Sequence, residues 1–344
     1  MKKAVISVGC AIVLAITIVL IYYNVSLTAV SKDETTIDLV VEKGSTATSV
    51  ISQLSDLGLI KSEFVTKIYI KLNNISDVKA GIYHFNKTMD VEELFRRLGK
   101  GSTINLDITI PEGKYLEQIA EIFASKTNNT KEELLSIWSN KEFVEDIINK
   151  YDFITEEILD KDIKYALEGY FFPSTYEFIN KNVTGEDIAY KLLDEMEKRL
   201  NKYQDLIDES GFTIHEVLTF ASIIQYEAIL EEDYYKISGV FHNRLDIGMK
   251  LESCATLDYA LGIHKVIYTF PDMATESPYN TYYVYGLPVG PGNMPSERAI
   301  KAVLNPDEHD YLFFLANVHD HNDPKTYYAK TYAEHLVNKD KYLK

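Results

Sequence analysis

The chain has 344 residues, a length that suits two or three domains. Apolar residues make up 46% and charged residues 25%, which predicts a packed core and excludes wholesale disorder. The balance of 35 Lys and Arg against 52 Asp and Glu gives a net charge of -17, so binding of a polyphosphate backbone is disfavoured and no nucleic-acid partner is expected.

An uncharged apolar segment, residues 4–23, opens the chain directly after two lysines. A helix rises about 1.5 Å per residue, so such a segment spans the hydrocarbon core of a bilayer, roughly 30 Å. The apolar part of a cleaved signal peptide is shorter, and this segment ends in two tyrosines, Tyr22 and Tyr23, as in an interfacial belt. The pattern therefore favours an uncleaved membrane anchor over a signal peptide.

The two lysines set the expected direction of this anchor. By the positive-inside rule they stay in the cytoplasm, so we expect residues 1–30 to be a cytoplasmic stub and a single-pass transmembrane helix in the cell membrane. Residues 31–37 form a polar linker, and the domains after it are expected to be extracytoplasmic. Cys10 lies inside the apolar segment, so no disulfide with Cys254 is expected.

A strand, turn and helix then recur along the chain. Counted from the last residue of each strand, apolar residues follow at +9 and +13, an i,i+4 stripe that would pack each helix on its strand. A true internal repeat and ordinary α+β order both explain this pattern, and both stay open. The strands are residues 38–41, 81–85 and 106–110, and the stripes are Val50 with Leu54, Leu94 with Leu98, and Ile119 with Phe123.

The next part is helical in pattern, from residue 130 to about 210, with an interruption at residues 169–173. A helix is then predicted to begin at Thr213, because Thr213 and Glu216 have the spacing of a capping box. Gln225 falls on the apolar stripe of this helix, and Glu227 projects about 200° away from it. A lone amide on an apolar stripe is more often a hydrogen-bonded core group than a functional one.

Residues 277–295 are rich in proline and glycine, which predicts a long, rigid, non-helical loop. Such loops often line binding sites. We therefore expect the helix from Thr213 to point Gln225 into a cleft with this loop, near Tyr279, as one wall.

Several short motifs resemble one known family, the endolytic murein transglycosylases or YceG-like proteins. The similarity runs in unchanged order from the apolar segment to the C-terminus, which makes it specific. The motifs are LEGYFFP at 167–173, ASIIQYEA at 221–228, VFHNRL at 240–245, GMKL at 248–251, SPYNTY at 277–282, GLP at 286–288 and KTYAEH at 330–335.

The resemblance implies an α+β fold in three parts. An N-terminal transmembrane helix precedes a small LysM-like module, residues 38–104, and a larger YceG-like catalytic-type domain, residues 105–344. The implied partners are glycan strands of peptidoglycan and cell-wall synthases. No cofactor and no metal are expected.

The resemblance also implies a reaction. These proteins cleave the bond between N-acetylmuramic acid and N-acetylglucosamine within nascent glycan strands, leave a 1,6-anhydro end, and so limit strand length. One carboxyl group protonates the departing oxygen and then accepts the proton of the C6 hydroxyl as that hydroxyl attacks C1. Burial on an apolar helix face would raise the pKa of such a carboxyl and keep it protonated near neutral pH.

The chain departs from the family at the position of this carboxyl, because the catalytic Glu aligns with Gln225. An amide cannot act as a general acid and base. The replacement is therefore expected to lower the reaction rate by a factor on the order of 10² to 10⁴. A naturally diverged paralogue explains this change better than one engineered replacement, because further positions have changed with it. They are Ser174, Cys254 with Ala255, residues 294–296, and Thr326.

Glu168, in the first motif, is the candidate carboxylate that would substitute for the missing one, with a purely structural role as the alternative. Glu227 is a weaker candidate, for which an ion pair is the simpler interpretation. Candidate substrate-binding residues are Asn243, Arg244, Tyr279, Asn280 and Tyr282, which ordinary packing also explains. Asp258, His319, His321 and His335 lack the spacing of a metal site.

Two hypotheses follow. The chain is an endolytic transglycosylase whose activity is reduced or depends on another carboxylate such as Glu168, or it is a non-catalytic peptidoglycan-binding paralogue. The replacement at Gln225 favours the second, and the resemblance favours the first.

Overall fold

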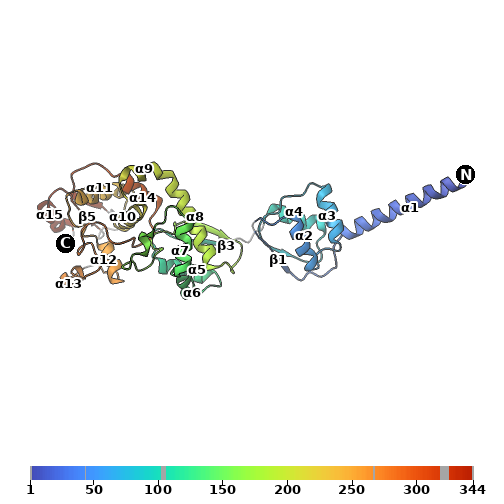
Figure 1. Ribbon diagram of the computed structural model, residues 1–344, viewed down its shortest axis with the longest axis horizontal. Coiled ribbons are helices and arrows are strands. Elements are labelled where there is room, and N and C mark those ends of the chain that lie inside the picture. Colours follow the sequence, from blue (N-terminus) through green and yellow to red (C-terminus); the bar gives the residue numbers. More distant parts are fainter. Residues whose placement is uncertain (1, 43, 102–105, 266–267, 318–324, 343–344) are drawn as a thin grey trace. The chain divides into compact units, whose positions relative to one another are not determined.

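The computed structural model describes residues 2–42, 44–101, 106–265, 268–317 and 325–342. It divides the chain into two compact units (Figure 1). The first contains residues 1–107 and 177–181, and the second contains residues 108–176 and 182–344. Each unit is mixed α and β, in agreement with the predicted fold class.

The first helix, α1 (Lys2–Leu27), covers the predicted apolar segment. Several of its apolar side chains are exposed, among them Val13, Leu14 and Val19. Among the described residues, no helix combines the length and the apolar character that a membrane crossing needs, so the predicted transmembrane helix is not confirmed.

The rest of the first unit packs three helices on a small sheet. Strands β1 (Ile37–Val41) and β2 (Gly81–Phe85) pair antiparallel, with Leu39 opposite Tyr83. The predicted stripe residues of α2 and α4 are fully buried in its core, which confirms the predicted strand and helix order. A likeness to a LysM module is not confirmed. The helices are α2 (Ala47–Asp56), α3 (Glu63–Leu72) and α4 (Val91–Lys100).

The second unit is mostly helical. Strands β3 (Leu106–Thr109) and β4 (Thr175–Phe178) pair in a two-stranded sheet and each contain residues of both units, whereas β5 (Phe313–Asn317) and β6 (Lys325–Ala329) form a two-stranded sheet within the second unit. Its α-helices are α5 (Leu116–Lys126), α6 (Lys131–Trp138), α7 (Lys141–Lys150), α8 (Gly185–Leu200), α9 (Gln204–Ser210), α10 (Ile214–Glu227), α11 (Asp233–Asp246), α12 (Cys254–Leu261), α13 (Phe270–Met273), α14 (Glu297–Leu304) and α15 (Tyr332–Tyr342), and its 3₁₀ helices are η1 (Glu156–Leu159) and η2 (Asn201–Tyr203).

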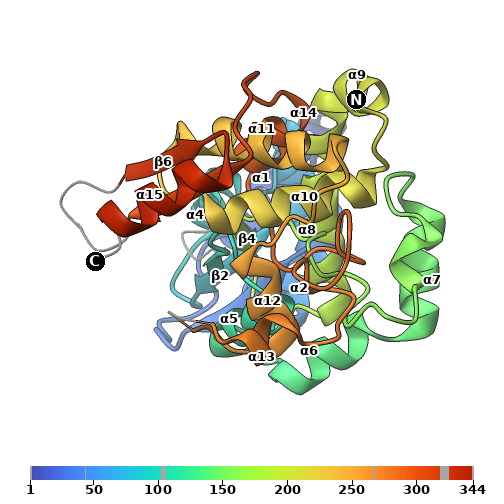
Figure 2. The ribbon, with the colours of Figure 1, turned by 90° about the vertical axis from the view of Figure 1, so that its left-hand side faces the viewer.

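Helix α10 lies at the centre of this unit, packed against α11, α12 and α14 (Figure 2). The predicted capping box is present, with the Thr213 hydroxyl accepting from the Glu216 amide and the Glu216 carboxylate accepting from the Thr213 amide. The sequence pattern predicted burial along one stripe of α10, but the buried surface extends around the helix. Helices surround α10, so its residues 217–224 are all buried.

Removing this cap gives a first test of the fold. Thr213→Ala loses the hydroxyl that accepts from the Glu216 amide, so we expect the free energy of unfolding to fall by about 1 kcal/mol. Thr213→Ser keeps the hydroxyl and should stay within about 0.5 kcal/mol of the wild type. Urea unfolding followed by circular dichroism measures both variants. Equal losses in the two would contradict a capping role.

The segment 277–295 contains no helix or strand, as predicted. Near the end of this segment, two hydrogen bonds between backbone groups join it to the residues that precede α5. The Gly113 amide donates to the Met294 carbonyl at 2.8 Å, and the Met294 amide donates to the Lys114 carbonyl at 2.9 Å. This pairing fixes the entry to α5, which carries several residues of the site.

Candidate functional site

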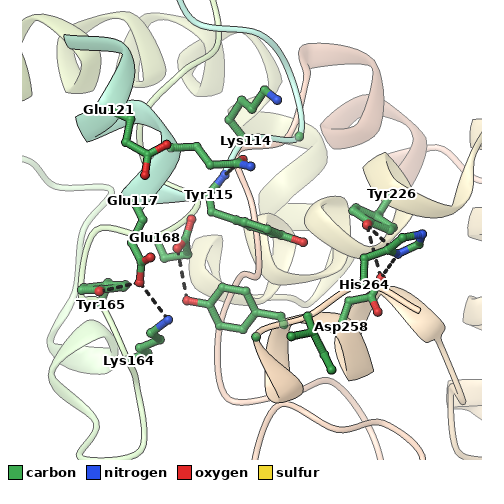
Figure 3. Close-up of a pocket in the computed structure, with 15 residues that line it drawn as sticks. Lys114, Tyr115, Glu117, Glu121, Lys164, Tyr165, Glu168, Tyr226, Asp258 and His264 are labelled. Carbon is green, nitrogen blue, oxygen red and sulfur yellow. Dashed lines mark hydrogen bonds and ion pairs between the residues drawn. The ribbon is translucent and has the colours of Figure 1, made fainter. Parts of the chain in front are cut away.

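The second unit contains a cavity of about 620 Å³. The start of α5, the turn before Gly169, the end of α10 and helix α12 surround it (Figure 3). Four carboxyl groups, five tyrosine and histidine rings and two lysines are among its lining groups. The lining residues are Gly113, Lys114, Tyr115, Glu117, Gln118, Glu121, Lys164, Tyr165, Glu168, Tyr226, Asp258, Tyr259, Gly262, Ile263 and His264.

Glu168 is the buried carboxyl of this cavity. Its side chain accepts hydrogen bonds from the Leu116 amide at 2.9 Å and from the Tyr259 hydroxyl at 3.1 Å, and the residue is only 2% exposed. Desolvation outweighs these two bonds and raises the pKa of Glu168 to about 8. The side chain is therefore a neutral acid at neutral pH, which is the form a proton donor needs.

The backbone turn after Glu168 fixes its position. Gly169 has a φ of +82°, and a Cβ atom at this position would lie 2.3 Å from the Pro291 Cβ. Only glycine fits both the left-handed conformation and the close approach. The segment 277–295 thus braces the acid without lining the cavity.

A second carboxyl group, Glu117, lies in the opposite protonation state. It accepts from the Tyr165 hydroxyl at 2.7 Å and pairs with the Lys164 ammonium at 3.0 Å. The Tyr165 bond and then the Lys164 bond lower the pKa of Glu117. The cavity therefore holds a neutral acid and a carboxylate side by side in one wall, a separation of pKa values that is common in sites of proton transfer.

Asp258 organises another part of the lining (Figure 3). It is 3% exposed and accepts from the Tyr226 hydroxyl at 3.2 Å and from His264 Nδ1 at 2.7 Å, while Tyr268 bonds its other oxygen. No sequence motif groups these residues, because they come from α10, α12 and the chain after α12. From its spacing, Asp258 is predicted only to lie outside a metal site.

Gln225 is not among the residues that line this cavity, and its expected place in a cleft stays a prediction. Its amide nitrogen donates to the Tyr234 hydroxyl at 3.1 Å, and its oxygen accepts from the Ser296 amide at 3.0 Å. Its Cγ lies 3.7 Å from the Cβ position of Gly113, a residue of the cavity lining. The amide thus joins α10 to the first residues of α14.

Asn243 and Arg244 have intramolecular partners and lie outside the cavity lining. The Asn243 amide donates to the carbonyls of His309 and Tyr311. The Arg244 guanidinium is 7% exposed and donates to three backbone carbonyls, those of Lys250, Leu251 and Leu312. Their glycan-binding role stays a prediction.

The predicted residues of the segment 277–295 also lie outside the lining. Tyr279 packs its ring 4.7 Å from that of Tyr259 and accepts from the Lys164 amide. Asn280 is fully buried and donates to the carbonyls of Met273 and Thr275, which precede this segment. The Tyr282 hydroxyl lies 3.4 Å from Cys254 Sγ. Tyr279 alone touches a cavity residue.

Glu227 faces away from Gln225, as its helical position predicted. Its carboxylate accepts from the Ser253 hydroxyl at 2.6 Å and lies at the start of α12. No group of three or more metal-binding side chains occurs in the described parts of the chain. His319 and His321 lie outside the described residues. Cys10 and Cys254 are unpaired.

The cavity is lined by a neutral buried acid, a carboxylate and several tyrosines. These groups suit a polar, ring-containing substrate such as a sugar, since tyrosine combines an apolar face with a hydroxyl. The chain belongs to the YceG-like family, which matches residues 39–341. This result confirms the family resemblance of the motifs.

Individual relatives agree with the family. The chain is 34% identical to an endolytic murein transglycosylase of Bacillus subtilis over 94% of this chain and 89% of that protein. It is also 34% identical to an endolytic murein transglycosylase of Streptococcus pneumoniae, of whose length it spans 57%. The crystal structure of a YceG-like protein from Listeria monocytogenes matches with a TM-score of 0.64 and 33% identity, over 88% of this chain and 99% of that chain.

Proposed function

We propose that this chain acts on peptidoglycan glycan strands as a lytic transglycosylase, with Glu168 as the proton donor in place of a carboxyl at position 225. The observation that carries the proposal is the neutral carboxyl of Glu168 in the wall of the cavity. The names of the relatives in Bacillus subtilis and Streptococcus pneumoniae support the substrate class.

In this reaction Glu168 donates its proton to the glycosidic oxygen between N-acetylmuramic acid and N-acetylglucosamine. The bond from C1 to that oxygen breaks, and the C6 hydroxyl oxygen of the same muramic ring bonds to C1. The proton of that hydroxyl passes to a base in the wall of the cavity, so one 1,6-anhydro end and one free 4-hydroxyl form without water. The aromatic rings of Tyr115 and Tyr259, 5.7 Å apart, would hold the sugar rings in place.

Digestion of purified murein tests the activity. The full-length protein is incubated with sacculi, and the soluble fragments are analysed by mass spectrometry for 1,6-anhydro ends. Anhydro-ended fragments from the native protein and none from a heat-denatured sample support the proposal. Fragments with reducing ends would indicate hydrolysis and contradict it.

The second candidate function is binding of glycan strands without cleavage. It is favoured by Gln225, because the family resemblance aligns this amide with the catalytic Glu and an amide cannot act as acid and base. Binding to sacculi in a sedimentation assay, with no fragment released, would support this function over the first.

Gln225→Glu separates the two functions. A carboxylate at this position still accepts from the Ser296 amide with one oxygen and from the Tyr234 hydroxyl with the other, so the variant should fold. If the native protein only binds, we expect this variant to release anhydro-ended fragments at least about 100-fold faster than the native protein, the usual worth of a general acid and base. Gln225→Asn keeps an amide and is the matched control.

A change of less than about threefold in Gln225→Glu, with clear cleavage by the native protein, would instead show that another group supplies the proton. Cleavage in both proteins would leave Glu168 as the carboxyl to test, as described in the Discussion.

The proposal extends to cellular placement. We propose that residues 4–23 anchor the protein in the cell membrane as a single pass, with the N-terminus in the cytoplasm. The LysM-like module, residues 38–104, and the catalytic-type domain, residues 105–344, then lie outside the cytoplasm. The exposed apolar side chains of α1 support this. Cell-wall synthases are the proposed protein partners, and limiting strand length the proposed role. Loss of the protein from carbonate-washed membranes would contradict the anchor.

A further inference from the structure

We propose that His264, oriented by Asp258, is a second catalytic residue of the cavity and accepts the proton of the substrate hydroxyl. This inference rests on the proposed transglycosylase function and divides its proton transfers between two groups. Glu168 gives a proton to the leaving oxygen, and His264 takes one from the attacking hydroxyl.

The geometry of the pair is the first argument. His264 Nδ1 lies 2.7 Å from the Asp258 carboxylate, which is buried, while 66% of the His264 side chain is exposed. Because the carboxylate accepts from Nδ1, the neutral imidazole carries its proton there and leaves Nε2 as the acceptor. A buried carboxylate that holds a histidine in this tautomer also stabilises the imidazolium formed when Nε2 takes a proton.

The second argument is the network around Asp258. Tyr226 and Tyr268 also bond this carboxylate, so three side chains fix its position. The pair and Tyr226 all line the same cavity as Glu168 (Figure 3). A surface ion pair would not need a carboxylate that is 97% buried and shared with two phenols, so an ordinary salt bridge explains the arrangement poorly.

The third argument is the exposure of the two proton-transfer groups. Glu168 is 2% exposed, whereas 66% of the His264 side chain is exposed, so the histidine ring is the better placed of the two to pass a proton to solvent. After each turnover Glu168 is a carboxylate and His264 an imidazolium. One proton then returns to Glu168 and one leaves His264 through solvent, so both groups are restored and no net proton is consumed.

His264→Asn tests the inference. The Asn amide nitrogen replaces Nδ1–H as the donor to Asp258, and the acceptor Nε2 is lost. We expect the kcat for release of anhydro-ended fragments to fall about 100-fold, with KM changed less than about twofold, because a general base acts in the transition state. His264→Gly should regain activity when imidazole is added, which a structural role would not allow.

A matched control exists in the first unit. His84 Nδ1 lies 2.5 Å from the exposed Asp38 carboxylate, and neither residue is among those that line the cavity, so His84→Asn makes the same change in another histidine–aspartate pair. It should keep full activity. Asp258→Asn, which alters a positioning residue, should lower kcat and leave KM unchanged.

The outcomes separate the inference from the proposed function. Cleavage by the native protein together with full activity of His264→Asn would overturn the role of His264 and leave the transglycosylase function standing. No anhydro-ended product from the native protein would overturn both. A similar fall in both the His264 and His84 variants would show a general loss of folding and would also contradict a catalytic role.

Discussion

Glu168→Gln is expected to reduce the release of anhydro-ended fragments by about 10³-fold, within the range lost when a general acid is removed. The variant should fold, because the glutamine oxygen still accepts from the Leu116 amide and its nitrogen can donate to the Tyr259 oxygen. Binding to sacculi should change little, since the substitution removes a proton and no volume. Activity is measured by mass spectrometry of soluble fragments.

The pH dependence of activity and stability in the native protein gives an independent check on Glu168. The pKa of Glu168 is raised from 4.5 to about 8 in the folded protein, so a proton donor in this position loses its proton, and activity should fall, above about pH 8. The pH dependence of stability is expected to reflect the same carboxyl group. The unfolded chain releases this proton near pH 4.5 and the folded protein near pH 8, so the contribution of Glu168 to stability decreases as pH rises through that window.

Glu168→Gln has no such proton. Its stability relative to the native protein should therefore increase between about pH 4.5 and pH 8, measured as the difference in urea midpoints at several pH values. Glu117→Gln is the matched control, because its pKa is lowered and its contribution changes in the opposite direction, at lower pH. Parallel pH profiles for native protein and Glu168→Gln would contradict a raised pKa.

Gly169→Ala is expected to lower the free energy of unfolding by about 3 kcal/mol or more. A left-handed conformation costs an alanine roughly 1 kcal/mol, and overpacking adds about 1 to 3 kcal/mol. The added Cβ would lie 2.3 Å from the Pro291 Cβ and 2.6 Å from its Cγ, within the close contact that braces Glu168. Urea unfolding measures the loss.

Gly211→Ala separates the two contributions. Gly211 has a φ of +75°, and no atom lies within 4 Å of its Cβ position, so only the conformational cost of about 1 kcal/mol remains. Equal losses in the two variants would show that contact with Pro291 has no effect.

Local patterns predicted much of the fold because their causes are local. A capping box links residues three apart, and a buried stripe links residues four apart, so Thr213 with Glu216 and Val50 with Leu54 could be found from spacing. The motifs also led to the correct family. The full burial of α10 could not be predicted, because it depends on which helices surround it.

The cavity depends on contacts between distant parts of the chain. Glu168 meets Leu116 across 52 residues and Tyr259 across 91 residues, and no periodicity reports such distances. Glu168 was a candidate through its motif, but Tyr226, Asp258 and His264 had no shared pattern. Gln225 was singled out by its place on an apolar stripe, but its hydrogen-bond partners Tyr234 and Ser296 lie 9 and 71 residues away, so helical spacing could not predict them.

The backbone pairing of Gly113 and Lys114 with Met294 has a consequence for how such a protein changes over evolution. Peptide groups make both bonds, so they do not depend on the side chain at position 294, provided that it is not proline. Residues 294–296 can therefore diverge from the family pattern while α5 keeps its starting point. Sequence divergence in this loop is therefore compatible with an unchanged backbone support for the cavity and its acid.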